Sequence, residues 1–260
     1  MRPADRLRQT VRLVLIGLWT LLCYGLWLIP ALLVLGFGRA SQRWNELGIR
    51  IWTRGLVTIM GIEVAVEGTP PRKPFFLVAN HLSYVDILVL GARLGPTFVS
   101  KHEIAGWPVL GHLARATGTI FVNRERKRDA MRVLGEIDRV VSRGGGVVLF
   151  PEGTSYQGDR VYPLKSALLE WAARREYPVH AAALRYTTGD PARPARDTVC
   201  WWGDMTFAPH FLRLLTLPRV HATIAFAREP VVGQERGALA ARLHACLQDT
   251  FTPLPALEGR

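Results

Sequence analysis

The pattern of apolar and polar positions divides the chain into two parts. From Leu13 to Gly38 there is no charged residue, and a helix of these 26 residues would be roughly 39 Å long. A bilayer core is about 30 Å thick, so the segment is long enough to cross it. Several residues inside or at the end of the segment are able to interrupt a helix: Gly25, Pro30, Gly36 and Gly38. We expect residues 1–60 to form a membrane-associated helical segment, either a tilted span or a hairpin embedded from one face.

After about residue 61, short apolar runs alternate with longer helical patterns. The runs that predict strands are 75–79, 97–100, 119–122, 147–150, 179–184 and 223–227. The patterns that predict helices are 84–93, 128–142, 164–174 and 235–250. This order predicts an α/β domain over residues 61–260, with a mostly parallel sheet covered by helices. Functional residues of such sheets gather at the carboxyl ends of strands, where His81, Arg124 and Glu152 would meet.

Composition and charge also predict that the protein associates with membranes. Hydrophobic residues make up 49% of the chain, and the formal net charge of +12 is spread along it. Beside an apolar segment, this charge predicts attraction to anionic lipid, worth about 1 kcal/mol per basic residue near the surface. We expect no nucleic-acid partner, because no zinc-finger spacing, helix-turn-helix signal or aromatic RNA-binding signature accompanies the charge. The three cysteines are far apart, and no histidine lies in a ligand pattern such as HExxH, so we expect no metal site.

The stretch Asn80-His81-Leu82-Ser83-Tyr84-Val85-Asp86 carries the first candidate chemistry. A neutral imidazole takes a proton from a hydroxyl, and a carboxylate on its other nitrogen fixes the tautomer. His81 and Asp86 are separated by four residues, which forms an HX4D motif. Two side chains five positions apart on one helix point about 140° away from each other, so His81 must precede the helix if it is to contact Asp86. We expect Ser83 to cap that helix, with Asp86 three residues later as in a capping box. The spacing alone leaves a second reading open, in which Asp86 only caps a helix and His81 only ends a strand.

Three blocks of sequence resemble one known family. NHLSYVD at 80–86, GTIFVNR at 118–124 and FPEGTS at 150–155 are similar, in order, to the motifs of glycerolipid acyltransferases, which include bacterial 1-acylglycerol-3-phosphate acyltransferases. Lys101, Glu103, Pro108 and Gly111 resemble the family's segment between the first two blocks. WWGDMTFAPHFLRLL at 201–215 is similar to the C-terminal part of many bacterial members. The resemblance thus covers most of the chain after residue 60.

The resemblance implies a reaction and a place for it. A fatty acyl group would pass from acyl-coenzyme A or acyl carrier protein to the free hydroxyl of 1-acyl-sn-glycerol-3-phosphate, giving phosphatidic acid for phospholipid synthesis. His81 would be the general base and Asp86 would orient it, with no cofactor and no acyl-enzyme. Consistent with this, the chain has no GxSxG nucleophile elbow. The enzyme would work at the inner membrane, with its catalytic domain facing the cytoplasm.

The resemblance also assigns substrate-binding positions. Arg124 would grip the acceptor's phosphate with a pair of charge-assisted hydrogen bonds. Glu152 would accept hydroxyls of the acceptor, and Gly153 would let the backbone come close. Thr154 and Lys101 complete the expected set. From the residues alone, Arg124 could instead belong to the solvated charged run 124–128, and the third block could be only a turn after a buried strand.

Two departures from the family pattern widen the choice of acceptor. Ser155 stands where many phosphatidate-forming members have an arginine, and Asn123 replaces an acidic residue of the second block. Arg160 and Lys165 follow closely and could compensate for the missing cation. Lyso-ornithine lipid acyltransferases resemble this chain too, so that acceptor is the alternative. We rank lysophosphatidate first, because that activity is commoner in the family and Arg124 is retained. A non-catalytic adaptor that binds anionic membranes is the rival from another class.

Overall fold

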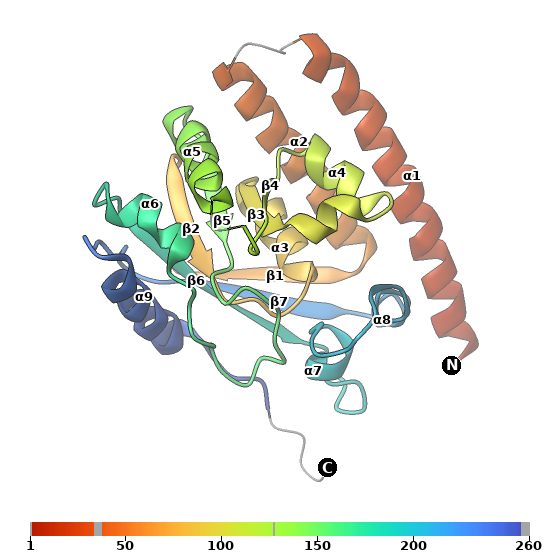
Figure 1. The fold of residues 1–260 in the computed structure, drawn as a ribbon. Helices are drawn as coiled ribbons and strands as arrows, with labels where there is room; N and C mark the ends of the chain where they lie inside the picture. Colours follow the sequence, from red (N-terminus) through yellow and green to blue (C-terminus); the bar gives the residue numbers. More distant parts are fainter. Residues whose placement is uncertain (1, 34–37, 127, 256–260) are drawn as a thin grey trace.

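A seven-stranded sheet forms the centre of the structure (Figure 1). The computed structural model describes residues 2–33, 38–126 and 128–255. The strands lie in the order β1 (Ile62–Glu67), β7 (Val220–Phe226), β6 (Val179–Thr187), β2 (Phe75–Ala79), β5 (Gly146–Leu149), β3 (Thr97–Lys101) and β4 (Ile120–Val122). β6 and β7 pair antiparallel, and the other neighbouring pairs of the described sheet are parallel. The predicted mostly parallel α/β fold is confirmed.

Helices cover both faces of this sheet, and β2 shows how the two cores arise. Phe75, Leu77 and Ala79 pack with α3 (Val85–Leu94) and α8 (Phe207–Leu214) on one face. Phe76 and Val78 pack with helices on the other face, namely α5 (Asp129–Ser142), α6 (Glu170–Ala173) and α9 (Arg236–Thr250). Every residue of β2 is buried. A strand covered on both sides has no polar face, which explains its uninterrupted apolar run.

Several elements differ from the sequence-based prediction. β1 was not predicted, because it is an edge strand that pairs with β7 and buries little of its length. The short helices α4 (Leu110–Ala116) and α7 (Ala195–Thr198), together with α8, were also not predicted. The predicted helix at 164–174 is a 3₁₀ turn at Ala167–Leu169 followed by the four-residue α6. Another 3₁₀ turn, His102–Gly106, follows β3.

The N-terminal segment forms two helices that lie side by side, α1 (Pro3–Leu33) and α2 (Gly38–Ile59) (Figure 1). Pro30 lies within α1 and does not end it. Gly36, another predicted interruption, lies outside the described residues. Indole groups join the two helices: Trp19 Nε1 donates to Trp52 O at 2.9 Å, Trp52 Nε1 to Thr20 Oγ1 at 3.1 Å, and Trp44 Nε1 to Trp27 O at 3.2 Å. These tryptophans therefore hydrogen-bond one helix to the other.

One side of α1 is bound to the α/β domain. Arg12 is buried, and its guanidinium donates to the carbonyl oxygens of Leu215, Leu217 and Pro218 at 3.0, 2.5 and 3.1 Å. About three turns further along the helix, the Tyr24 hydroxyl is hydrogen-bonded to His112 Nε2 of α4 at 2.7 Å. Polar contacts with the domain thus extend along most of the helix.

The opposite side of α1 presents an apolar surface. Large hydrophobic side chains are exposed at helical spacing along it: Leu7, Val11, Val14, Leu15, Leu18, Leu21, Leu22 and Leu26. Leu47 and Ile51 of α2 are exposed as well. Within the described residues, Pro3–Trp27 is long and apolar enough to cross a membrane, and it contains an 18-residue window with a mean hydropathy of 1.6. The helix therefore combines a face bound to the domain with a face that offers leucines and valines to an apolar phase over about five turns.

Candidate active site

The site is built on residues 80–83, which connect β2 to α3 without regular secondary structure. Such a segment must find partners for its backbone groups elsewhere. Asn80 is fully buried, and its side-chain amide donates to Leu184 O at 3.1 Å and accepts from Leu184 N at 2.6 Å. It thereby extends the β2–β6 pairing past the end of the strand. His81 N donates to Glu152 Oε2 at 2.6 Å, and His81 O accepts from Tyr156 N at 2.9 Å. The backbone of His81 is held from two sides.

His81 and Asp86 meet, which the spacing alone had left open. His81 lies before α3, and its Nδ1 is 2.7 Å from Asp86 Oδ2. The same oxygen accepts from Leu82 N at 2.7 Å and from Ser83 N at 3.0 Å. An ionised carboxylate only accepts, so His81 Nδ1–H donates to it and Nε2 keeps its lone pair. This tautomer is the one a general base needs.

The expected cap by Ser83 is wrong. Tyr84 precedes α3 and makes no side-chain cap, and Ser83 Oγ is buried without a partner among the described residues. The Asp86 carboxylate instead reaches back to the amides of Leu82 and Ser83, as the acidic residue of a capping box does. One carboxylate therefore binds the helix entrance and the imidazole together.

Aromatic packing fixes the plane of the His81 ring. The ring stacks on Phe150, with centroids 4.3 Å apart and planes at 19°, and Phe150 stacks in turn on Phe98. The His81 side chain is still 20% exposed, whereas that of Asp86 is 0% exposed. The base is accessible to a substrate, and the group that orients it is not.

Two cations, Arg124 and Lys165, flank Gly153, one residue beyond Glu152, and a third, Lys101, is near enough for its pKa to respond to their charges. Arg124 follows β4 and donates to Gly153 O. A Cβ at position 153 would lie 2.9 Å from Lys165 Nζ and 3.0 Å from Arg124 Nη1, and Gly153 has φ +84°. Glycine is thus needed here for both conformation and space. Burial, and then the charge of Arg124, lower the pKa of Lys101 at the end of β3.

This cluster is suited to an anionic group. Lys165 also contributes to the lowered pKa of Lys101, while nearby Glu103 opposes it. Guanidinium and ammonium groups that lie close together and are half-buried bind phosphate or carboxylate through charge-assisted hydrogen bonds. Lys165 thus lies where it can compensate for the arginine missing at position 155. Arg160 does not, because its guanidinium lies over the Tyr162 ring, 4.8 Å from the centroid. Thr154 follows Gly153 and is exposed.

Glu152 contacts the protein backbone rather than open space. It is 3% exposed, and its Oε2 and Oε1 accept from His81 N at 2.6 Å and Tyr162 N at 2.8 Å. The sequence predicted that this carboxylate accepts hydroxyls of the acceptor. Its burial and its two amide partners favour a role in holding the His81 segment against the loop at 153–162.

The protonation of Glu152 should make stability depend on pH. Burial raises the pKa of Glu152 from 4.5 to about 7, against the opposing effect of its two backbone hydrogen bonds. Between these values the folded protein binds more protons than the unfolded chain, so the free energy of unfolding falls as pH rises, by up to about 3 kcal/mol. The Glu152→Gln variant should lack this part of the pH dependence of the free energy of unfolding. Melting temperatures at pH 5 and pH 8 in one detergent test it; an equal pH dependence in both proteins would contradict it.

The structure also adds a residue that the sequence did not reveal. Tyr186 lies at the carboxyl end of β6, and its hydroxyl donates to Asp86 Oδ1 at 2.6 Å. The apolar run predicted a strand ending at residue 184, two residues short of it. Continuing the strand through Arg185 would have placed Tyr186 at the same sheet edge as His81.

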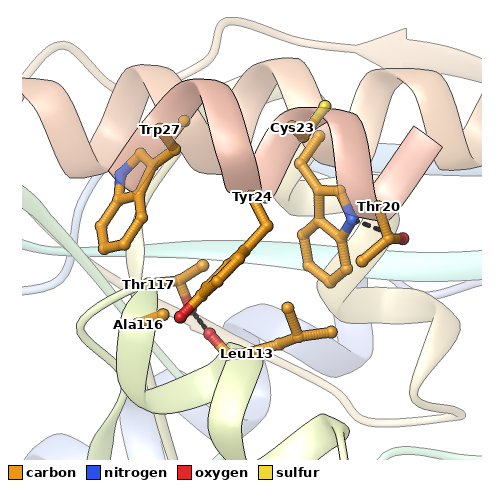
Figure 2. Close-up of a pocket in the computed structure, with 9 residues that line it drawn as sticks. Thr20, Cys23, Tyr24, Trp27, Leu113, Ala116 and Thr117 are labelled. Carbon is orange, nitrogen blue, oxygen red and sulfur yellow. Dashed lines mark hydrogen bonds between the residues drawn. The ribbon is translucent and has the colours of Figure 1, made fainter. Parts of the chain in front are cut away.

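Two other features bear on bound groups. A small apolar cavity lies between α1, α2 and α4 (Figure 2), lined by Thr20, Cys23, Tyr24, Trp27, Gly48, Trp52, Leu113, Ala116 and Thr117. Its volume of about 40 Å³ is too small for an acyl chain. Across the described ranges, no group of three or more His, Cys, Asp or Glu side chains is arranged to bind a metal ion.

Comparison with known proteins agrees with the geometry. Residues 61–185 match a family model described as acyltransferase. A lyso-ornithine lipid O-acyltransferase from Rhizobium meliloti is 36% identical over 217 residues, which cover 79% of this chain and 73% of that protein. The chain belongs to the acyltransferase family. A 1-acyl-sn-glycerol-3-phosphate acyltransferase from Neisseria meningitidis is 30% identical to this acyltransferase over 175 residues, covering 66% of the chain and 68% of that protein.

A solved structure shares the fold. The crystal structure of a 1-acyl-sn-glycerophosphate acyltransferase from Thermotoga maritima superposes on this acyltransferase with a TM-score of 0.62 at 18% sequence identity. The match covers 93% of this chain and 97% of that one. The shared fold therefore includes most of the N-terminal helices as well as the sheet.

Proposed function

We propose that this acyltransferase moves a fatty acyl group from a thioester donor to the free hydroxyl of a lysolipid, with His81 as the general base. The observation that carries the proposal is the 2.7 Å contact of His81 Nδ1 with the buried carboxylate of Asp86. A partly exposed imidazole with its second nitrogen free is what deprotonation of a hydroxyl requires. An adaptor that only binds anionic membranes accounts for the charge but gives no reason for this pair.

The chemistry follows from that arrangement. His81 Nε2 takes the proton of the acceptor hydroxyl while its oxygen attacks the thioester carbonyl. The C–O bond forms, the C–S bond breaks, and the proton passes from the imidazolium to the leaving thiolate. Asp86 stabilises the imidazolium between these two transfers. Acyl-coenzyme A and acyl carrier protein both present such a thioester, and either serves as donor.

Lyso-ornithine lipid is the acceptor we place first. Relatives with that name from Rhizobium meliloti and Rhodobacter capsulatus are 36% and 34% identical, against 30% for the Neisseria meningitidis enzyme. This changes the order expected from the sequence, which put lysophosphatidate first. Ser155 agrees with the change, because it is buried and its hydroxyl donates to Trp201 O in place of an arginine directed at phosphate.

Lysophosphatidate is the second candidate, favoured by the cation cluster. Lys101, Arg124 and Lys165 together match the charge of a phosphate, although a single carboxylate also fits among them. Offering the purified protein equal amounts of both lysolipids in one reaction tests the order. We expect acylated ornithine lipid to predominate; predominant phosphatidic acid would reverse the order.

The apolar face of α1 supports a place at the membrane. With Arg12 and Tyr24 bound to the domain, we propose that the exposed leucines of α1 insert into one leaflet and that the basic surface contacts anionic lipid. Because both donors are made in the cytoplasm, we place the enzyme at the cytoplasmic side of the inner membrane.

Arg124 provides a test of acceptor binding. Arg124→Ala should raise the KM for the lysolipid about tenfold or more, because it removes charge-assisted hydrogen bonds to the acceptor's anionic group. Arg124→Lys should restore binding only in part, since an ammonium lacks the paired donors. Steady-state kinetics with varied lysolipid measure the effect. Arg160→Ala, which removes an exposed cation outside the cluster, is the control; equal KM values for both alanine variants would argue against the site.

A further inference from the structure

The carboxylate of Asp86 has two oxygens with different partners. Oδ2 receives His81 Nδ1 and the amides of Leu82 and Ser83. Oδ1 receives the hydroxyl of Tyr186 at 2.6 Å, and no other donor reaches Oδ1 within residues 2–33, 38–126 and 128–255. Asp86 is 0% exposed, so bulk water does not reach Oδ1. The Tyr186 hydroxyl therefore decides whether Oδ1 is satisfied.

Tyr186 is well placed to fix the carboxylate. It is itself fully buried, at the carboxyl end of β6, which runs parallel to β2 and beside it. Asn80 bonds the same strand at Leu184, two residues earlier. β6 thus supports both ends of the segment that carries His81. Burial raises the pKa of Tyr186 well above its ordinary value of 10, so the hydroxyl stays protonated and donates.

We propose that Tyr186 is a positioning residue, whose hydroxyl holds the Asp86 carboxylate in the orientation that keeps Oδ2 on His81 Nδ1. The proposal rests on the proposed function of His81 as general base. Without the hydroxyl, Oδ1 is an unpaired buried acceptor, and rotation of the carboxylate toward other donors competes with its bond to the imidazole. Removal of the Tyr186 hydroxyl therefore affects the substrate only indirectly, through Asp86 and His81.

The test is the Tyr186→Phe variant, which keeps the ring and removes one oxygen. We expect kcat to fall about 10- to 100-fold, by analogy with the loss of residues that orient the ligands of a catalytic metal. KM for the lysolipid and for the acyl donor should stay unchanged, because Tyr186 is buried away from both. Tyr177→Phe is the matched control: it removes the hydroxyl that donates to Pro74 O at 3.1 Å, at the other end of the sheet. That variant should keep the wild-type kcat.

A double-mutant cycle separates positioning from a general structural role. In an Asp86→Asn background, Tyr186→Phe should cost little further activity, because the two residues act on His81 as one unit. Full additivity of the two losses would overturn the inference, as would a Tyr186→Phe enzyme with wild-type kcat or one that fails to fold. Transfer by wild type and by Tyr177→Phe is measured in the same assay. No transfer by either contradicts the proposed function, whereas normal transfer by Tyr186→Phe contradicts the positioning role alone.

Discussion

Replacement of His81 by alanine is expected to reduce acyl transfer by about 10²- to 10⁴-fold, the usual contribution of a positioned general base. The acceptor hydroxyl then loses the group that takes its proton, and among the residues that the structure describes no second imidazole contacts the Asp86 carboxylate. The protein should remain folded, because the backbone bonds of residue 81 to Glu152 and Tyr156 do not use the imidazole. The measurement is kcat with labelled acyl-coenzyme A and a lysolipid acceptor.

A matched control is available for this prediction. His221 lies on β7, and its side chain is 47% exposed beside Glu63. His221→Ala should leave transfer unchanged. A His81→Ala enzyme that transfers as fast as His221→Ala would mean that another group is the base.

Asp86→Asn is expected to impair both transfer and folding. The amide is no longer an anion, so it neither fixes the His81 tautomer nor stabilises the imidazolium, and a loss of about 10²- to 10⁴-fold is expected. The asparagine NH₂ group must also take the place of a carboxylate oxygen that, in the wild-type protein, accepts a hydrogen bond from Leu82 N, Ser83 N or the Tyr186 hydroxyl. Leaving one of these buried groups unpaired should lower the free energy of unfolding by about 1–3 kcal/mol.

Two measurements on one protein check this pair of effects. The first is kcat, and the second is the denaturant midpoint in the detergent used for the assay. Loss of activity with unchanged stability would show that Asp86 does not organise the segment at residues 82–83. Loss of stability with unchanged activity would show that it does not serve the base.

The parts of the site that the sequence predicted are those with local causes. A short apolar run without alternation predicted a strand buried on both faces, and from this the position of His81 at a strand end followed. The rotation of a helix over five residues then required His81 to lie before it. In both cases neighbouring residues in the chain contain the information.

The parts that were missed depend on pairing between distant strands. Tyr186 approaches Asp86 only because β6 lies beside β2, and nothing within the sequence around residue 186 specifies that neighbour. Glu152 was expected to face the acceptor, but the loop after β5 turns its carboxylate toward the backbone of His81 and Tyr162. Ser83 looked like a cap, but the Asp86 carboxylate already binds the amides at the helix entrance.

In the N-terminal helices too, local features were predicted and distant contacts were not. Hydropathy and length predicted a membrane-associated segment, but they carry no information on which side of α1 contacts the domain. Arg12 identifies the side of α1 that contacts the domain, because a buried guanidinium needs carbonyl partners and Arg12 donates to carbonyl oxygens within residues 215–218. The leucines on the opposite side are then the ones left for lipid.

Direct transfer from a thioester to a lysolipid hydroxyl is tested by one quenched reaction. Purified protein is mixed with acyl-coenzyme A labelled in the acyl group, with and without lyso-ornithine lipid, and the label is followed in lipid and in protein. With the acceptor, we expect one labelled lipid product per thiol released; without it, we expect neither thiol release nor labelled protein. Label bound covalently to the protein, or thiol release without an acylated lipid, would contradict the account.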